Sequence, residues 1–168
     1  MADSDPKAHG HPARIDRAQY DKTAPDAVAA LMALGKAVDA SGLDKSLTEL
    51  VKLRASQING CAFCVQMHIN LSRQLKTPQA KLDQLAVWTE SGLFSLRERA
   101  ALAWTETLTR MATGGVPDAA YTQVQAQFSE SEIVFLTAAI SNINAWNRIA
   151  GALHFTPPPA TGLAGSTP

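Results

Sequence analysis

Two cysteines, Cys61 and Cys64, form a CxxC motif, and His68 follows Cys64 by one helical turn. If this segment starts a helix, the spacing i, i+3, i+7 places all three side chains on one stripe. Cys61 would lie at the helix N-terminus, where unpaired backbone N–H groups and the helix dipole favour a thiolate. His68 can accept the proton of Cys64, directly or through one water, if both face a common cavity. The spacing therefore predicts a redox-active thiol pair with its own base.

A CxxC motif can also attach haem, form a thioredoxin-like site or bind zinc. Covalent haem attachment needs a histidine directly after the second cysteine, where this chain has Val65. A thioredoxin-like site would follow a strand, yet the preceding segment has helical periodicity. A structural zinc site needs four ligands, which would be Cys61, Cys64, His68 and His154, because the other two histidines lie in the N-terminal segment. That zinc site, and a pair of inert core cysteines, remain open alternatives.

The composition describes a single domain without a strong preference for a charged partner. The chain has 168 residues, with 15 lysines and arginines balanced by 15 aspartates and glutamates. This balance favours neither nucleic acid nor an anionic membrane surface as a partner. No apolar run approaches the roughly 18 residues of a membrane span, and the N-terminal segment lacks the apolar stretch of a secretory signal. We therefore expect a cytoplasmic protein.

Apolar residues recur at helical spacing through the middle of the chain, and strand patterns are nearly absent. This predicts an all-α fold with the helical domain at 21–155, a mobile N-terminal segment at 1–20 and a mobile, proline-rich tail at 156–168. Ser95 with Glu98, and Ser129 with Glu132, have the spacing of capping boxes. Together with glycines and prolines they divide the domain into about six helices, with candidate ranges 25–39, 44–58, 61–75, 78–90, 95–111 and 129–150, and a further short one at 117–127.

The stretch from Glu49 to Cys64, ELVKLRASQINGCAFC, resembles the core of the alkylhydroperoxidase D (AhpD)-like proteins of the carboxymuconolactone decarboxylase superfamily. The segments ERAALAW at 98–104 and NINAWNR at 142–148 are similar to that family too. The resemblance covers about 43–153. It implies an all-helical bundle with the CxxC motif at the start of a central helix, assembled as a homo-oligomer, commonly a trimer or a hexamer.

The resemblance also implies an activity, the thiol-dependent reduction of a hydroperoxide by a peroxidase that serves in antioxidant defence. By position, Cys64 corresponds to the cysteine that attacks the peroxide and Cys61 to its disulfide partner. Glu49 and His68 match the family's proton relay. A small thiol or a dithiol protein would restore the pair, and no metal or organic cofactor is needed. One departure from the better-known members is Phe63, which stands where they have a histidine between the cysteines.

Three further residues have an interpretation from spacing alone. Glu49 falls beside the apolar stripe of its helix, so a solvent-facing side chain is the alternative to a functional one. Arg54 falls within that stripe, and we expect it to pair with a carboxylate across a helix or subunit contact. His154 follows the last helix and is expected to interact with its C-terminal carbonyls, without a catalytic role.

Two other functions remain open. One is a lyase that resembles carboxymuconolactone decarboxylase and acts on a small cyclic carboxylate, although such chemistry has no need for a thiol pair. The other is a non-enzymatic redox-sensing oligomer, in which the disulfide switches partner binding. A sensor would be oxidised once per event and would show negligible turnover with excess reductant.

Overall fold

The structure is a computed structural model that describes residues 11–161. Within this range it contains α-helices and one 3-10 helix, and no strand, so the predicted all-α fold is confirmed. The elements are α1 (Arg17–Thr23), α2 (Pro25–Asp39), α3 (Lys45–Ile58), α4 (Ala62–Gln74), α5 (Gln79–Gln84), η1 (Leu85–Val87), α6 (Leu96–Thr109), α7 (Met111–Gly114), α8 (Asp118–Gln125) and α9 (Glu130–Leu153).

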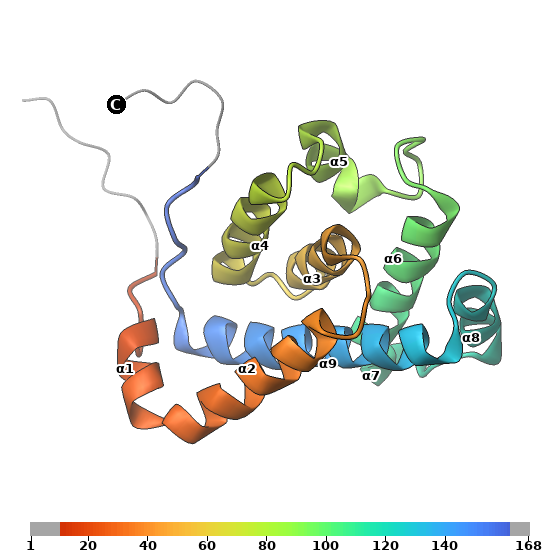
Figure 1. Cartoon of the computed structure of the whole chain (residues 1–168). Coiled ribbons are helices and arrows are strands. Elements are labelled where there is room, and N and C mark those ends of the chain that lie inside the picture. The colour runs from red at the N-terminus through yellow and green to blue at the C-terminus, as the bar shows by residue number, and fades with distance from the viewer. Residues whose placement is uncertain (1–10, 162–168) are drawn as a thin grey trace, which may run out of the picture.

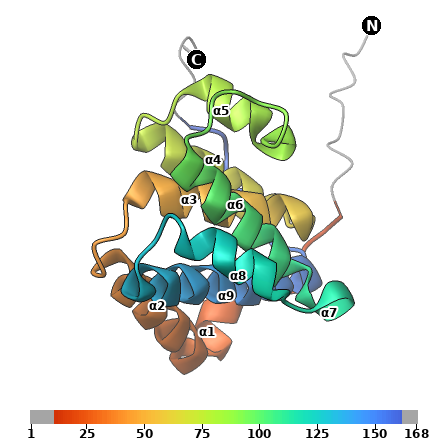
Figure 2. The same cartoon turned by 90° about the vertical axis from the view of Figure 1, so that its right-hand side faces the viewer.

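Helix α3 lies at the centre of the molecule (Figure 1). It packs against α4, α6 and α9, and against the η1 turn. The long helix α9 runs along one side of this group, with α2 crossing it (Figure 1). Helix α8 packs against α6 and α9, beside the N-terminal end of α9 (Figure 2). Because α3 is enclosed by its neighbours, eight of its residues are buried, namely Leu47, Thr48, Glu49, Leu50, Val51, Leu53, Ala55 and Ser56.

Local sequence signals explain where the main helices begin. Ser95 and Glu98 form a complete capping box at the start of α6, and Ser129 and Glu132 form a second one at the start of α9. In each box the serine side chain and the glutamate side chain satisfy backbone N–H groups that have no partner within the helix. Both predicted capping boxes are therefore confirmed.

The structure describes part of each of the two segments that were predicted to be mobile, and their mobility stays a prediction. Residues 17–20, expected to be part of a mobile segment, belong to helix α1, because Asp16 caps its N-terminus by accepting a hydrogen bond from the Gln19 N–H. The described part of the predicted tail contacts α4. Asn70 of α4 donates to the Pro159 carbonyl and accepts from the Thr161 N–H. These contacts lay the tail along α4 (Figure 1). The remaining predicted mobile residues, 1–10 and 162–168, lie outside the described residues.

Within the domain, the predicted helix at 78–90 is shorter, consisting of α5 and the η1 turn. The helix expected at 95–111 ends at Thr109, and the short helix α7 follows. None of the helices within residues 11–161 has a stretch that is long and apolar enough to span a bilayer.

An ion pair joins the central helix to α6. Arg54 Nη2 lies 2.7 Å from Glu106 Oε1, and the two side chains are 12% and 21% exposed. Trp88 Nε1 donates to the same oxygen at 2.8 Å. Burial would raise the pKa of Glu106, but the hydrogen bonds from Trp88, Arg54 and Arg110 outweigh it and lower that pKa. The expected carboxylate partner of Arg54 is thus confirmed.

Breaking this pair should weaken the fold. Glu106→Leu leaves the Arg54 guanidinium and the Trp88 N–H without their acceptor, so we expect a loss of about 3 kcal/mol in the free energy of unfolding, measured by urea denaturation. Asp21→Asn, which breaks the exposed pair between Arg17 and Asp21, should cost less than about 1 kcal/mol. Equal losses in the two variants would contradict the assigned role of Glu106.

Candidate active site

A tight turn between α3 and α4 places the CxxC motif. Gly60 has a φ of 65°, in the left-handed region that other residues rarely adopt. The turn closes with a hydrogen bond from the Cys61 N–H to the Ser56 carbonyl. Cys61 is the N-cap residue of α4 rather than its first helical residue, and Cys64 lies within the first turn. The predicted helix start is therefore off by one residue.

The two sulfurs lie next to one another. Their separation is 2.7 Å, longer than the roughly 2.05 Å of a disulfide bond, so both thiols are free. The Cys64 N–H also points to Cys61 Sγ, at 3.4 Å. Both residues are buried, with 2% of Cys61 and 1% of Cys64 exposed. At this separation a disulfide can close with a small adjustment of the side chains.

The two thiols have very different acidities. The hydrogen bond from Cys64, helped by the N–H of Cys64 and the side chain of Asn147, outweighs burial and lowers the pKa of Cys61 to about 7. The same contact raises the pKa of Cys64, because that thiol donates to the Cys61 sulfur, is buried, and faces the negative charge of the Cys61 thiolate. Near neutral pH a substantial share of the molecules therefore has a Cys61 thiolate, with Cys64 as the protonated partner.

Asn147 of α9 belongs to this site, although spacing gave it no role. It is 3% exposed, donates to Ser56 Oγ at 3.0 Å, and accepts from Asn59 Nδ2 at 2.9 Å. These contacts hold its amide between the end of α3 and the cysteines. Its position could have been suspected only from its place in the NINAWNR segment, because an asparagine within an apolar helix does not by itself indicate a function.

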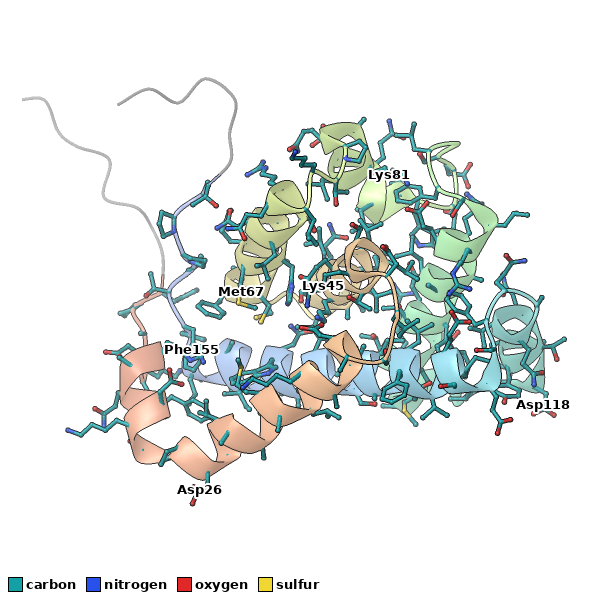
Figure 3. All side chains as sticks on the ribbon, viewed as in Figure 1. Asp26, Lys45, Met67, Lys81, Asp118 and Phe155 are labelled. Atoms are coloured by element: carbon teal, nitrogen blue, oxygen red, sulfur yellow. The ribbon has the colours of Figure 1, made fainter. Side chains whose placement is uncertain are left out.

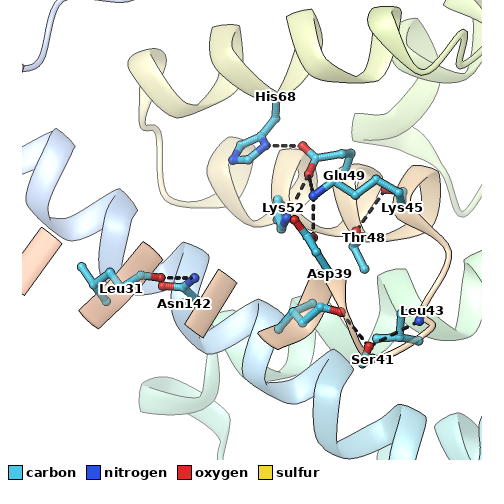
Figure 4. A network of polar contacts seen from close by, with 11 residues as sticks. Leu31, Asp39, Ser41, Leu43, Lys45, Thr48, Glu49, Lys52, His68 and Asn142 are labelled. Carbon is cyan, nitrogen blue, oxygen red and sulfur yellow. Dashed lines mark hydrogen bonds and ion pairs between the residues drawn. The ribbon is translucent and has the colours of Figure 1, made fainter. Parts of the chain in front are cut away.

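The carboxylate of Glu49 is buried between α3 and α4. The alternative that its spacing left open, a side chain facing solvent, is therefore wrong. Its Oε2 lies 2.6 Å from His68 Nδ1, and its Oε1 lies 2.9 Å from Lys52 Nζ and 3.5 Å from Lys45 Nζ (Figure 4). Burial would raise the pKa of Glu49, but the hydrogen bond and charge of His68 and the charge of Lys52 lower it to about 2. Glu49 is thus an ionised carboxylate that orients the imidazole.

No hydrogen bond joins His68 to either sulfur in the described part of the chain. Its Nδ1 is used by Glu49, and its Nε2 is buried without a hydrogen-bond partner in the described structure. Cys64 precedes His68 by one turn of the same helix, so a proton would pass between them through a bridging molecule. The predicted pairing of Glu49 with His68 is present, whereas a direct hydrogen bond to Cys64 is not.

The expected common cavity is divided into two. Cys61 lines a cavity of about 440 Å³ at the N-terminus of α4, together with Phe63, His154 and Phe155. Glu49 and His68 line a different cavity, of about 250 Å³, between α2, α3, α4 and α9. Met67 and Lys45 also line that second cavity, and Phe155 lies at the other one (Figure 3). The side chains of Ile143 and Trp146 belong both to the wall of the second cavity and to the apolar cluster around the cysteines.

His154 and Phe63 occupy places that spacing did not indicate. The His154 backbone caps α9, as expected, with its N–H bonded to the Gly151 carbonyl at 3.3 Å. Its ring lies 5.4 Å from that of His11 at the wall of the Cys61 cavity. Phe63 packs edge-on against Phe155, with ring centres 5.4 Å apart. Within residues 11–161, no group of three or more His, Cys, Asp or Glu side chains is arranged to hold a metal ion.

Comparison with known proteins finds relatives that share most of this chain. YdfG of Bacillus subtilis (strain 168), an uncharacterized protein, is 35% identical over 82% of this chain and 93% of its own length. The crystal structure of an Agrobacterium tumefaciens protein of unknown function, described as an AhpD protein of antioxidant defence, is 43% identical and covers 88% of this chain and 99% of its own, with a TM-score of 0.83.

A more distant structure has the same fold. It is the AhpD core of an uncharacterized peroxidase-related protein from Ralstonia eutropha JMP134, with a TM-score of 0.75 and 23% identity over 89% of this chain and 80% of its own. The sequence model of the carboxymuconolactone decarboxylase family matches residues 25–107, which include the CxxC motif, Glu49 and His68. The chain, with its AhpD-like fold, belongs to the carboxymuconolactone decarboxylase family.

Proposed function

We propose that the protein is a thiol-dependent peroxidase that reduces a hydroperoxide with the electrons of Cys61 and Cys64. The observation that carries this proposal is the sulfur pair itself, 2.7 Å apart, with the pKa of Cys61 lowered to about 7. A thiolate is the nucleophilic form of cysteine, and a second thiol in contact with it can close a disulfide. The likeness to AhpD and peroxidase-related structures supports the same function.

The first step is the attack of a thiolate on the hydroperoxide. The Cys61 sulfur forms a bond to the terminal oxygen of ROOH, the O–O bond breaks, and the leaving alkoxide takes a proton to become an alcohol. Cys61 is then a sulfenic acid. The family resemblance gives this role to Cys64, but the acidities and the cavity at Cys61 favour Cys61 as the attacking residue.

The second step closes the disulfide. Cys64 loses its proton and attacks the sulfenic sulfur, the S–S bond forms, and the departing hydroxide takes a proton to leave as water. The raised pKa of Cys64 means that this thiol needs a base. His68, held by the ionised Glu49, supplies that base through a bridging water. A small thiol or a dithiol protein then reduces the disulfide by exchange and restores both cysteines. We further propose that the protein works as a homo-oligomer, a trimer or a hexamer.

Replacing either cysteine should abolish turnover. We expect Cys61→Ser and Cys64→Ser each to lower the rate of hydroperoxide consumption with excess dithiothreitol by at least about 100-fold, because each removes one of the two sulfurs. In Cys64→Ser, one equivalent of peroxide should leave a sulfenic acid on Cys61 that dimedone traps and mass spectrometry locates. Full turnover by Cys64→Ser would refute the mechanism, and a parent protein that is oxidised once but never turns over would indicate a redox sensor.

The reactivity of Cys61 should depend on pH with a midpoint near 7. Because the thiolate is the form present above the pKa, alkylation of Cys61 by iodoacetamide should accelerate about tenfold between pH 6 and pH 8 and then level off. Asn147→Ala removes one hydrogen bond to the sulfur and should move the midpoint upward. A midpoint near the ordinary thiol value of about 8.5 in the parent protein would rule out an activated Cys61.

Removing the charge of Glu49 should slow the second step selectively. In Glu49→Gln the amide no longer stabilises a protonated imidazole, so we expect disulfide closure to slow by about 100-fold while sulfenic acid formation on Cys61 changes little. Stopped-flow tryptophan fluorescence with a single addition of peroxide separates the two rates. Glu98→Gln is the matched control, since Glu98 also pairs with a lysine but lies away from the cysteines. Equal slowing in both variants would exclude a specific role for Glu49.

A further inference from the structure

Part of the wall around Cys61 is not helical. Cys61 is 2% exposed, so a molecule reaches its sulfur through the cavity of about 440 Å³ that this residue lines. Most of the wall is the start of α4, with the turn before it, and the end of α9. The other wall residues are His11 and three residues of the C-terminal segment (residues 155–161), namely Phe155, Thr156 and Pro157. The position of this segment therefore sets part of the boundary of the cavity.

The C-terminal segment begins with a buried aromatic residue, Phe155. Its ring packs edge-on against Phe63 of α4, with ring centres 5.4 Å apart, and lies 5.8 Å from the ring of Tyr20. The Phe155 N–H donates to the Ala150 carbonyl of α9 at 3.0 Å. Packing and a backbone hydrogen bond thus join the start of the segment to the domain.

The other end of the segment contacts Asn70 of α4, a buried amide. Asn70 Nδ2 donates to the Pro159 carbonyl at 2.9 Å, and its Oδ1 accepts from the Thr161 N–H at 3.0 Å. Gln66 Nε2 donates to the same Oδ1 at 2.9 Å, so both lone pairs of this oxygen are used. The guanidinium of Arg73 reaches the Thr161 carbonyl at a longer distance, 3.4 Å. Asn70 therefore makes the two shorter hydrogen bonds between α4 and this end of the segment.

The chain between these two attachments has little slack. Residues 157–159 are three successive prolines, whose fixed φ favours an extended backbone. The four residues from Phe155 to Pro159 cover about 12 Å at roughly 3.1 Å per residue. Phe63 and Asn70, their contacts on α4, are two turns apart on one face of that helix, which is about 10.5 Å. Because the two lengths nearly match, the contact with Asn70 determines where the segment passes beside the cavity.

We propose that Asn70 is a positioning residue that determines which molecules reach Cys61, because it holds the C-terminal segment beside the cavity. With both ends of the segment attached, a compact molecule reaches the sulfur and a bulky one is excluded. Without the Asn70 contacts the segment can move away from α4 while Phe155 stays packed. Access to the sulfur does not depend on peroxidase activity. Only its consequence, a preference for compact hydroperoxides over bulky ones, rests on the proposed function.

Two maleimides with the same reacting ring measure this access. N-methylmaleimide is compact, whereas N-(1-pyrenyl)maleimide carries a large aromatic group, and mass spectrometry locates either label on Cys61. Asn70→Ala removes both hydrogen bonds to the segment, so we expect the pyrenyl reagent to react at least about tenfold faster and the methyl reagent to change by less than about twofold. The midpoint near pH 7 for alkylation by iodoacetamide should stay in place, because the hydrogen bonds to the sulfur are unchanged.

Gln74→Ala, which removes an exposed amide one turn further along α4, is the matched control and should leave both rates unchanged. Pro158→Gly makes the segment more flexible without altering α4, and should also accelerate the pyrenyl reagent selectively. The proposal is overturned if Asn70→Ala leaves the ratio of the two rates unchanged, if it accelerates both reagents equally, as a general loosening of the fold would, or if Pro158→Gly has no effect. Because no peroxide is added, these outcomes do not depend on whether the protein is a peroxidase.

Discussion

The ionised carboxylate of Glu49, buried between two helices, is the interaction on which the site depends. A charge this deep in a helical bundle is tolerated only with close partners, and Glu49 has His68 on one oxygen and Lys52 on the other. Because Glu49 belongs to α3 and His68 to α4, their contact fixes the relative position of the two helices. The turn at Gly60 joins the same two helices at their other end and carries Cys61. The His68 imidazole and the two thiols are thus held at one corner of the fold.

The division into two cavities gives each half of this corner its own surroundings. Cys61, the more acidic thiol, adjoins a cavity that is also lined by His154 and Phe155, which follow α9. The imidazole of His68 adjoins the cavity beneath α2. Cys64 lies between these two cavities. Its sulfur contacts the Cys61 sulfur, and His68 follows it by one turn of α4. In the proposed mechanism, the attack on the hydroperoxide and the transfer of the second proton would therefore take place on different sides of the same helix.

Much of the fold follows from local sequence rules, and the exceptions have physical reasons. The capping boxes at Ser95 and Ser129, and the CxxC at a helix start, depend on neighbouring residues and were predictable. The burial of Glu49 was harder to predict, because other helices surround α3 and leave it no solvent-exposed face on which a carboxylate would be expected. Periodicity locates a buried face only where a helix also has an exposed one. Family resemblance, rather than spacing, indicated the role of Glu49. The positions of Asn147 and His154, and the contacts between the tail and Asn70, depend on residues that are distant in sequence. No local sequence pattern indicates such contacts.

The central claim is that Cys61 and Cys64 pass both of their electrons to one hydroperoxide molecule and end in a bond to each other. Mass spectrometry after one equivalent of cumene hydroperoxide, with remaining thiols blocked by alkylation, measures this directly. The account predicts one pair of hydrogens lost per chain, a peptide linked between Cys61 and Cys64, and one equivalent of cumyl alcohol. Two cysteines that remain fully alkylatable after the peroxide has been added would contradict it.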